Sequence, residues 1–331
     1  MPASSGGQSA LCLSRAGGGA AFARRNLIPS GSGSATAERI FGRLIHCYNR
    51  NSDPATEALG GGVARFPVVG RKNAGTVEEA ELASYFGVAP EIVGFVSELL
   101  QDLSELGSDP ELIVQWLRDA GLAGAQTRVL DLGCGKGAVA VAVAEALGCR
   151  VDGVDALSGF VEVARGQARR LGLEHLCHFD LGDLRETVQD ARGYDAVLLI
   201  AVGVLGSTAD IVGGCRRCVA SGGLIIIDGA YLRESEKLVF PGYEELTTRD
   251  ETLRQLTSYG DHLVRELTLS VETVRAQNLR YTGWIVHRAD ELSARYPEHA
   301  DAFHAYLEKE QQECAILETA VTCATWMLQR A

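Results

Sequence analysis

A strand, a glycine-rich turn and a helix follow one another between Val129 and Leu147. The turn is Gly133–Gly137, where glycines let the backbone turn tightly and approach a ligand closely. The helix that begins at Ala138 offers unpaired N–H groups and the positive end of its dipole to such a ligand. Asp131, at the end of the strand, adds a carboxylate that suits a cation and would sit awkwardly beside a pyrophosphate.

Two further carboxylates follow the next two predicted strands. Asp155 ends the strand Arg150–Val154, where a carboxylate can accept hydrogen bonds from both hydroxyls of a ribose. The strand His175–Phe179 leads to Asp183, which could accept from the exocyclic amine of adenine while Leu184 covers the ring. Three acidic residues after three successive strands are a more specific signal than the glycines alone.

These segments resemble the successive motifs of class I S-adenosylmethionine (SAM)-dependent methyltransferases, in order and in spacing. They are Val129–Gly137, Gly153–Asp155, Gly182-Asp183, Tyr194–Val197 and Ser221–Ile227. The resemblance implies an α/β, Rossmann-like fold with a doubly wound, seven-stranded, mostly parallel sheet whose final strand is reversed. It is greatest for the small-molecule enzymes. It implies SAM as cofactor, held by Asp131, Gly133, Cys134, Gly135, Gly137, Asp155, Ala156, Asp183, Leu184 and Ile200.

Two other readings stay open. Gly133, Gly135 and Ala138 also satisfy the GxGxxA pattern of an NAD-dependent Rossmann oxidoreductase, and Asp155 would suit an NAD ribose. Such an enzyme has no use for the carboxylates of Asp131 and Asp183, and no Tyr-x-x-x-Lys pair follows, so SAM is favoured. A non-catalytic SAM-binding or scaffold protein is the second alternative.

Alternating strands and helices position these residues. Further strands are expected at Arg128–Leu132, Tyr194–Ile200, Leu224–Ile227, His262–Ser270 and Ala320–Leu328, with helices at Ala138–Leu147, Ser158–Leu171 and Asp210–Val219. Continuously apolar strands indicate a parallel sheet that is covered on both faces. The last two strands are separated by Val271–Thr319, 49 residues of helical pattern, expected to lie over the active site as a lid or acceptor pocket.

Three regions are expected along the chain. Residues 1–37 are rich in Ser, Gly and Ala, which predicts a disordered tail or a transit peptide. Residues 38–125 form a helical N-terminal cap, and residues 126–331 form the SAM-binding domain with the insert 271–319. The helices expected in the cap are Glu38–Tyr48, Glu91–Leu106 and Glu111–Ala120.

The acceptor side is less well marked. Ligands of such a sheet bind beyond the carboxyl ends of its strands, which makes Val202, Leu205 and Tyr231 candidate substrate contacts. In the insert, Tyr281 and Trp284 share a helical face with His287 beside it. They read either as core packing with a solvated histidine, or as an aromatic wall with His287 and Tyr281 as catalytic residues. The sequence lacks the motifs of methyltransferases that act on nucleobase amino groups or on the cytosine ring.

Composition narrows the class of protein. The formal charge of −12 over 331 residues repels phosphate backbones, so a small-molecule acceptor is expected rather than nucleic acid. No apolar run reaches membrane-spanning length, and the single CxxC pair, Cys215 and Cys218, is too few ligands for zinc. Nine cysteines suit a reducing compartment, and so the cytoplasm, or an organelle if a transit peptide is present. The acceptor, the atom methylated (O, N or C) and the oligomeric state stay open.

Overall fold

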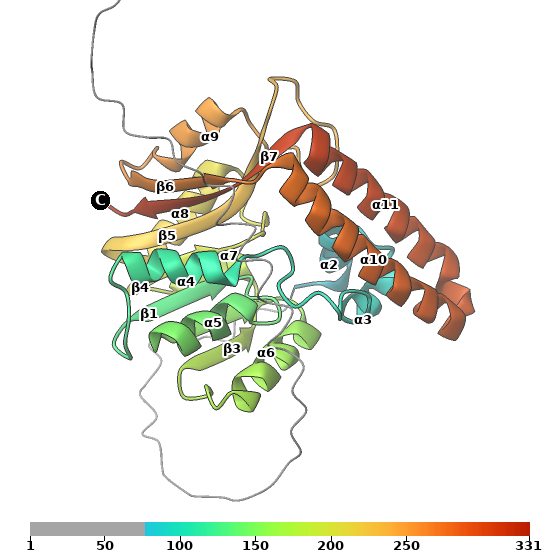
Figure 1. Cartoon of the computed structure of the whole chain (residues 1–331), viewed down its shortest axis with the longest axis horizontal. Coiled ribbons are helices and arrows are strands. Elements are labelled where there is room, and N and C mark those ends of the chain that lie inside the picture. The colour runs from blue at the N-terminus through green and yellow to red at the C-terminus, as the bar shows by residue number, and fades with distance from the viewer. Residues whose placement is uncertain (1–76) are drawn as a thin grey trace, which may run out of the picture. The chain divides into compact units, whose positions relative to one another are not determined.

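The computed structural model describes residues 77–331 as one sheet with covering helices and a separate group of helices (Figure 1). The expected tail 1–37 and the helix Glu38–Tyr48 lie outside the described residues. The sheet has seven strands in the order β3-β2-β1-β4-β5-β7-β6. They are β1 Arg128–Leu132, β2 Arg150–Asp155, β3 Cys177–Leu181, β4 Tyr194–Leu199, β5 Val219–Leu232, β6 His262–Thr268 and β7 Val321–Gln329.

The direction of the strands matches the prediction. Strands β3, β2, β1, β4 and β5 pair in parallel, whereas β7 is antiparallel to both β5 and β6. The carboxyl ends of β1 to β4 therefore meet at one edge, and β6 points the same way as β5. The predicted seven-stranded, mostly parallel sheet with a reversed final strand is confirmed.

Helices cover both faces of the sheet. One face packs against α4 Pro110–Asp119, α5 Ala138–Leu147 and α6 Ser158–Arg170. The other packs against α7 Leu184–Asp190, α8 Thr208–Cys218 and α9 Arg249–Leu256. Successive residues of β5 explain the continuous apolar runs, because Ile225 and Ile227 point into one core and Ile226 into the other.

A third hydrophobic core joins the helical insert to the N-terminal helices. The insert comprises α10 Val271–Arg295, the 3-10 helix η3 Pro297–His299 and α11 Ala300–Thr319, and α10 lies beside α11 in Figure 1. These pack with α2 Glu79–Phe86, η2 Pro90–Phe95 and α3 Val96–Leu99. Leu157 and Phe160, which follow the end of β2, belong to the same core. The predicted insert between the last two strands is thus helical and contacts the carboxyl edge of the sheet.

Several boundaries differ from the prediction for local reasons. The third strand starts at Cys177 rather than His175, because the N–H groups of Leu176 and Cys177 donate to the carbonyl of Leu173 in a turn. The long helix expected at Glu91–Leu106 is wrong. The chain forms η2 and the short α3 there, and the carbonyls of Leu100 and Leu103 bind Lys136 instead of continuing a helix.

One strand is longer than the sequence predicts, and three short helices have no counterpart in the prediction. Strand β5 continues beyond Ile227 because residues 228–232 pair with β7, so Tyr231 lies within the strand and not after it. The short helices α2, α7 and α9 were not predicted. Within residues 77–331 no single helix is both long and apolar enough to span a membrane; Glu79–Phe86 and Pro90–Leu99, bent by 80°, meet that test only as a pair.

Candidate cofactor and acceptor site

The glycine-rich turn after β1 requires glycine. Gly133 and Gly137 have φ of 75° and 81°, which is left-handed backbone. A Cβ built on Gly133 would lie 2.4 Å from Cγ2 of Val202, and one on Gly137 would lie 2.9 Å from Cβ of Ala164. Gly137 is the N-cap of α5, so the helix points its free N–H groups at the turn as predicted.

Asp131 is a buried carboxylate beside that turn. Only 2% of the residue is exposed, and Oδ2 has no hydrogen-bond partner. Burial, and then the nearby charge of Asp155, raise the pKa of Asp131 to about 7, although the N–H of Ala140 acts in the opposite direction. A buried carboxylate oxygen without a donor is costly, and a ligand that brings a cationic N–H donor would satisfy it. The site therefore fits the ammonium end of SAM and does not fit a pyrophosphate.

Asp155 shapes the turn from the end of β2. Its Oδ2 accepts from the N–H of Gly135 at 2.8 Å and its Oδ1 from the N–H of Leu157 at 2.9 Å. Burial raises the pKa of Asp155, and these N–H groups partly offset that effect. Each carboxylate oxygen can accept a second hydrogen bond, so Asp155 keeps capacity for two hydroxyls. The half-buried Ala156 follows it, and ribose contacts here stay a prediction.

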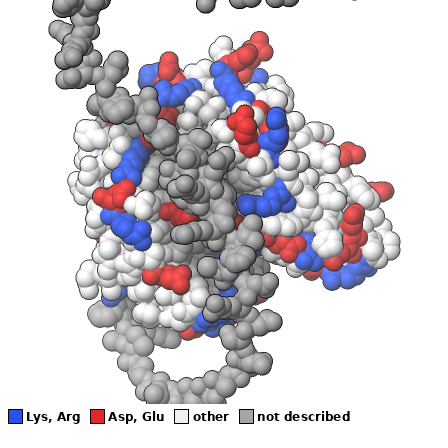
Figure 2. All heavy atoms as spheres, in the orientation of Figure 1, with Lys and Arg blue, Asp and Glu red and all other residues white. Residues whose placement is uncertain are grey.

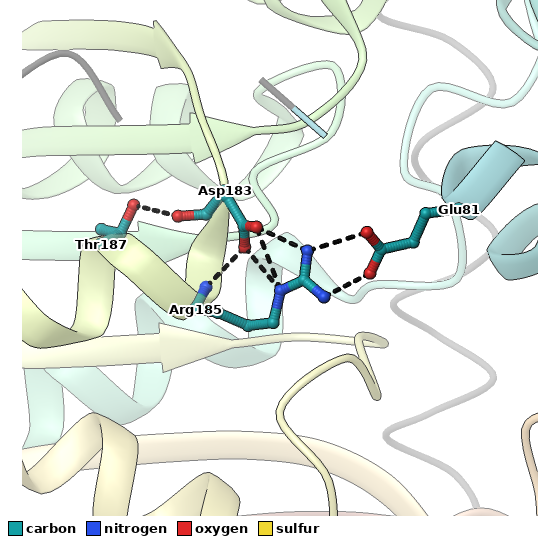
Figure 3. Close-up of polar contacts among 4 residues, drawn as sticks. All are labelled: Glu81, Asp183, Arg185 and Thr187. Atoms are coloured by element: carbon teal, nitrogen blue, oxygen red, sulfur yellow. Dashed lines mark hydrogen bonds and ion pairs between the residues drawn. The ribbon is translucent and has the colours of Figure 1, made fainter. Parts of the chain in front are cut away.

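Asp183 lies at the same edge of the sheet, but its carboxylate is engaged (Figure 3). Nε of Arg185 lies 3.0 Å from both carboxylate oxygens, and the N–H of Arg185 donates to Oδ1 at 2.8 Å. Arg185 also binds Glu81 of α2. Burial opposes ionisation of Asp183, yet the bonds from Arg185 hold the pKa of this carboxyl below its usual range. The predicted contact with adenine stays a prediction, and Arg185 was not foreseen.

The remaining predicted cofactor residues are buried. Leu184 packs in the core beneath α7 and α8, and Ile200 packs in the core on the opposite face. Cys134 is buried within the turn, and burial raises the pKa of its thiol, so it is a neutral packing residue there. These three side chains are uncharged, so the acidic groups of the predicted site are Asp131, Asp155 and Asp183.

The two predicted contacts in the loop after β4 point to different places. Val202 packs on Gly133 and so lies at the cofactor turn. Leu205 faces α8, where it lies against Gly214 and lines a groove with Arg217 and Tyr259. Leu205 therefore supports the flank of the loop, and a contact between Val202 and the acceptor stays a prediction.

The aromatic residues expected to form an acceptor wall pack against other parts of the fold. Tyr281 and Trp284 stack with ring centroids 6.0 Å apart, and the guanidinium of Arg280 lies over both rings. Both rings pack on the core of the helical group. Tyr231 lies 6.4 Å from Trp326, ring to ring. The interpretation as core packing fits this arrangement better than an open aromatic wall.

His287 is a surface residue. Its side chain is 65% exposed, and Nε2 lies 3.4 Å from a carboxylate oxygen of Glu291 on the next turn of α10. A general base needs to contact the acceptor in an enclosed site, and among residues 77–331 no element covers most of this imidazole. The structure therefore corrects the catalytic interpretation of His287 in favour of the solvated one.

Polar residues that the sequence did not indicate lie on α2 and α11. Tyr85 is 43% exposed as a residue, but its hydroxyl lies near the backbone of Gly203, where burial, then the charge of Asp155, raise the pKa of Tyr85 to about 12. Tyr243 donates to Glu313 at 2.7 Å. Burial and the charge of Glu313 raise the pKa of Glu310 to about 7. The charges of Asp155 and Glu313 both oppose ionisation of the Tyr85 phenol.

The described residues include no group of three metal-ligating His, Cys, Asp or Glu side chains. The seven cysteines in this part of the chain are free thiols, and Cys215 and Cys218 are buried in α8.

The strand order, the reversed β7 and the glycine turn after β1 together define the class I, Rossmann-like methyltransferase architecture. Residues 129–223 match the family model described as "Methyltransferase domain". This match agrees with the class I SAM-dependent methyltransferase that the motifs of the segment predict.

Curated relatives match over the same part of the chain. A ribosomal protein L11 methyltransferase from Thiobacillus denitrificans is 34% identical over 137 residues, which cover 40% of this chain and 42% of the relative. A release factor glutamine methyltransferase from Bordetella pertussis is 36% identical over 115 residues, or 33% of this chain and 40% of the relative. The matched segment thus spans about two fifths of the length of these relatives.

A solved structure covers more of the fold. A SAM-dependent methyltransferase from Geobacter sulfurreducens, in complex with S-adenosylhomocysteine (SAH), aligns with a TM-score of 0.61 and 19% identity. The alignment covers 74% of this chain and 99% of that one. At this identity the likeness establishes the fold, and SAH is the product that SAM leaves after methyl transfer.

Proposed function

We propose that this protein transfers a methyl group from SAM to O, N or C of a small organic acceptor by in-line displacement. The observation that carries the proposal is the buried, unpartnered oxygen of Asp131 beside the glycine turn. It calls for a cationic donor at the place where the methionine end of SAM is expected. The match of residues 129–223 to a methyltransferase domain supports the same activity.

The residues of the chain mainly bind, orient and exclude water. SAM supplies a methyl group already activated on a sulfonium. Asp131 would accept from its ammonium group, and Asp155 from its ribose hydroxyls while it fixes the turn through Gly135. The helical core around α10 and α11 would shield the reacting atoms from water. Because positioning supplies most of the rate in such a displacement, no general base is required for every acceptor.

Coverage of the carboxyl edge supports a small acceptor. The insert and the N-terminal helices form one core with Leu157 and Phe160, which directly follow β2, so helices stand over the edge where an acceptor must enter. Figure 2 shows basic and acidic side chains interspersed on the face in view, and the formal charge is −12. Neither feature favours a polyphosphate chain as substrate.

Two measurements test the proposal in sequence. Titration calorimetry with SAM and SAH should give saturable binding, and NADH should give none; the reverse result would refute the cofactor assignment. Transfer of a labelled methyl group should then be followed with amines, phenols, alcohols and carboxylates.

The names of the curated relatives provide a necessary comparison. Both relatives are named for methylation of a protein, so an unfolded polypeptide belongs in the same assay. Label on the polypeptide, and on none of the small molecules, would overturn the small-acceptor part alone. Saturable SAM binding with label on neither would favour the alternative of a non-catalytic SAM-binding protein.

A further inference from the structure

The segment Leu100–Gly107 is held to the cofactor turn by a buried lysine. Lys136, inside the glycine turn, is 4% exposed, and its Nζ donates to the carbonyls of Leu100 and Leu103, the latter at 2.9 Å. The same ammonium lies 5.5 Å from the ring centroid of Phe160. Two of its three N–H donors are therefore used within the protein, and the ammonium is buried at this place.

The other side of this segment is held by the insert. Arg288 of α10 donates to Asp102 through two parallel bonds, Nε to Oδ2 at 2.6 Å and Nη2 to Oδ1 at 2.9 Å. Both side chains are partly buried, which strengthens a bidentate pair relative to an exposed one. A continuous path of contacts thus runs from the glycine turn through Lys136 and Asp102 to α10.

Backbone strain is concentrated where this path meets the sheet. Leu106 and Ala201 have φ of 49° and 56°, a conformation that costs a non-glycine residue on the order of 1–3 kcal/mol. Leu106 packs on the turn, since a Cβ built on Gly135 would lie 2.8 Å from its Cδ1. Such strain persists only when surrounding contacts hold it, and Lys136 and Arg288 supply contacts at both sides of the segment.

We propose that Lys136 is a positioning residue that couples α10 to the cofactor turn, so that the acceptor side closes over a loaded cofactor. The coupling rests on the proposed function, because it requires SAM or SAH to bind at the turn. A ligand that fixes the turn fixes Lys136, and through Leu100–Gly107 it favours one position of α10. By thermodynamic reciprocity, loss of the contact between Lys136 and the segment weakens cofactor binding.

Hydrogen exchange with SAH as the probe tests this directly. In the wild-type protein, saturating SAH should slow amide exchange in residues 271–295 by about tenfold, within the usual range of coupling. Lys136→Met should bind SAH about tenfold more weakly and, when saturated, should protect residues 271–295 by less than about twofold. Lys237→Met makes the same chemical change at an exposed position and should behave as the wild type.

A second variant decides the matter if Lys136→Met does not fold. Arg288→Gln leaves the glycine turn untouched, so saturating SAH should still protect residues 100–107 while protection of residues 271–295 is lost. Protection of 271–295 that survives in Arg288→Gln would overturn the coupling, as would wild-type protection in a folded Lys136→Met. Absence of SAH binding to the wild-type protein would instead refute the proposed function, so the two failures are distinguishable.

Discussion

The charge state of Asp131 should make cofactor binding depend on pH. In the free protein, burial and the charge of Asp155 raise the pKa of Asp131 to about 7. A bound ammonium group stabilises the carboxylate, so the pKa of Asp131 in the complex must be lower than in the free protein. Below pH 7 binding therefore releases a proton, and the affinity for SAH falls as the pH falls.

The expected loss of affinity follows from how far the pH lies below the pKa of Asp131. Well below the free pKa, each pH unit costs about 1.4 kcal/mol, or a factor of about ten in affinity. Between pH 8 and pH 5 the affinity for SAH should thus fall by about 100-fold, or less if the pKa in the complex stays above 5. The stability of the ligand-free protein should depend on pH in the opposite direction. Because the folded pKa lies above the unfolded value, this residue contributes stability below about pH 4 that is lost as the pH rises through 7.

Calorimetry with two ligands isolates the effect. SAH carries the ammonium group, whereas 5′-methylthioadenosine keeps the adenosyl part and lacks it, so only SAH should show the steep dependence between pH 5 and pH 7. In Asp131→Asn the dependence should disappear for both ligands, and the ligand-free variant should be more stable than the wild type at pH 8. Equal pH profiles for the two ligands in the wild type would refute the contact between Asp131 and the ammonium.

Three further predictions concern single side chains. Asp155→Ala should weaken SAM binding by on the order of 1.5–3 kcal/mol in calorimetry, through loss of a charged acceptor, and unchanged affinity would place Asp155 away from the ribose. His287→Gln should leave the pH profile of methyl transfer unaltered, because the imidazole is exposed and faces Glu291; a lost alkaline or acidic limb would restore its catalytic role. Gly133→Ala should lower the free energy of unfolding by more than about 1 kcal/mol in urea titration, since φ is positive and Val202 occupies the space; wild-type stability would contradict both reasons.

The sheet could be predicted from the sequence because its signals are local. Strand β1 and helix α5 have the expected bounds, Arg128–Leu132 and Ala138–Leu147, since an apolar run, a glycine turn and a second apolar run follow directly. The positions of Asp131 and Asp155 followed from the same pattern. Their burial and mutual charge did not, because those depend on strands that are distant in the sequence.

The contacts between the cofactor motifs and the helical group could not be predicted, because they also join residues that are distant in the sequence. Arg185 binds both Asp183 and Glu81. The ammonium of Lys136 donates to a backbone carbonyl of the N-terminal segment. These partners lie 104 and 33 residues away, so neither pairing leaves a pattern in a short window. His287 shows the converse error, because helical spacing alone placed it near Tyr281 without indicating which face of α10 is solvent-exposed.

Several contacts between the sheet and the helical group that covers its carboxyl edge begin at cofactor motifs. Lys136 belongs to the glycine turn, Arg185 follows the carboxylate after β3, and Leu157 and Phe160 follow the carboxylate after β2. Each of them contacts the helical group that covers the edge. A cofactor that shifts these motifs by a small amount would therefore also act on the helices that cover this edge.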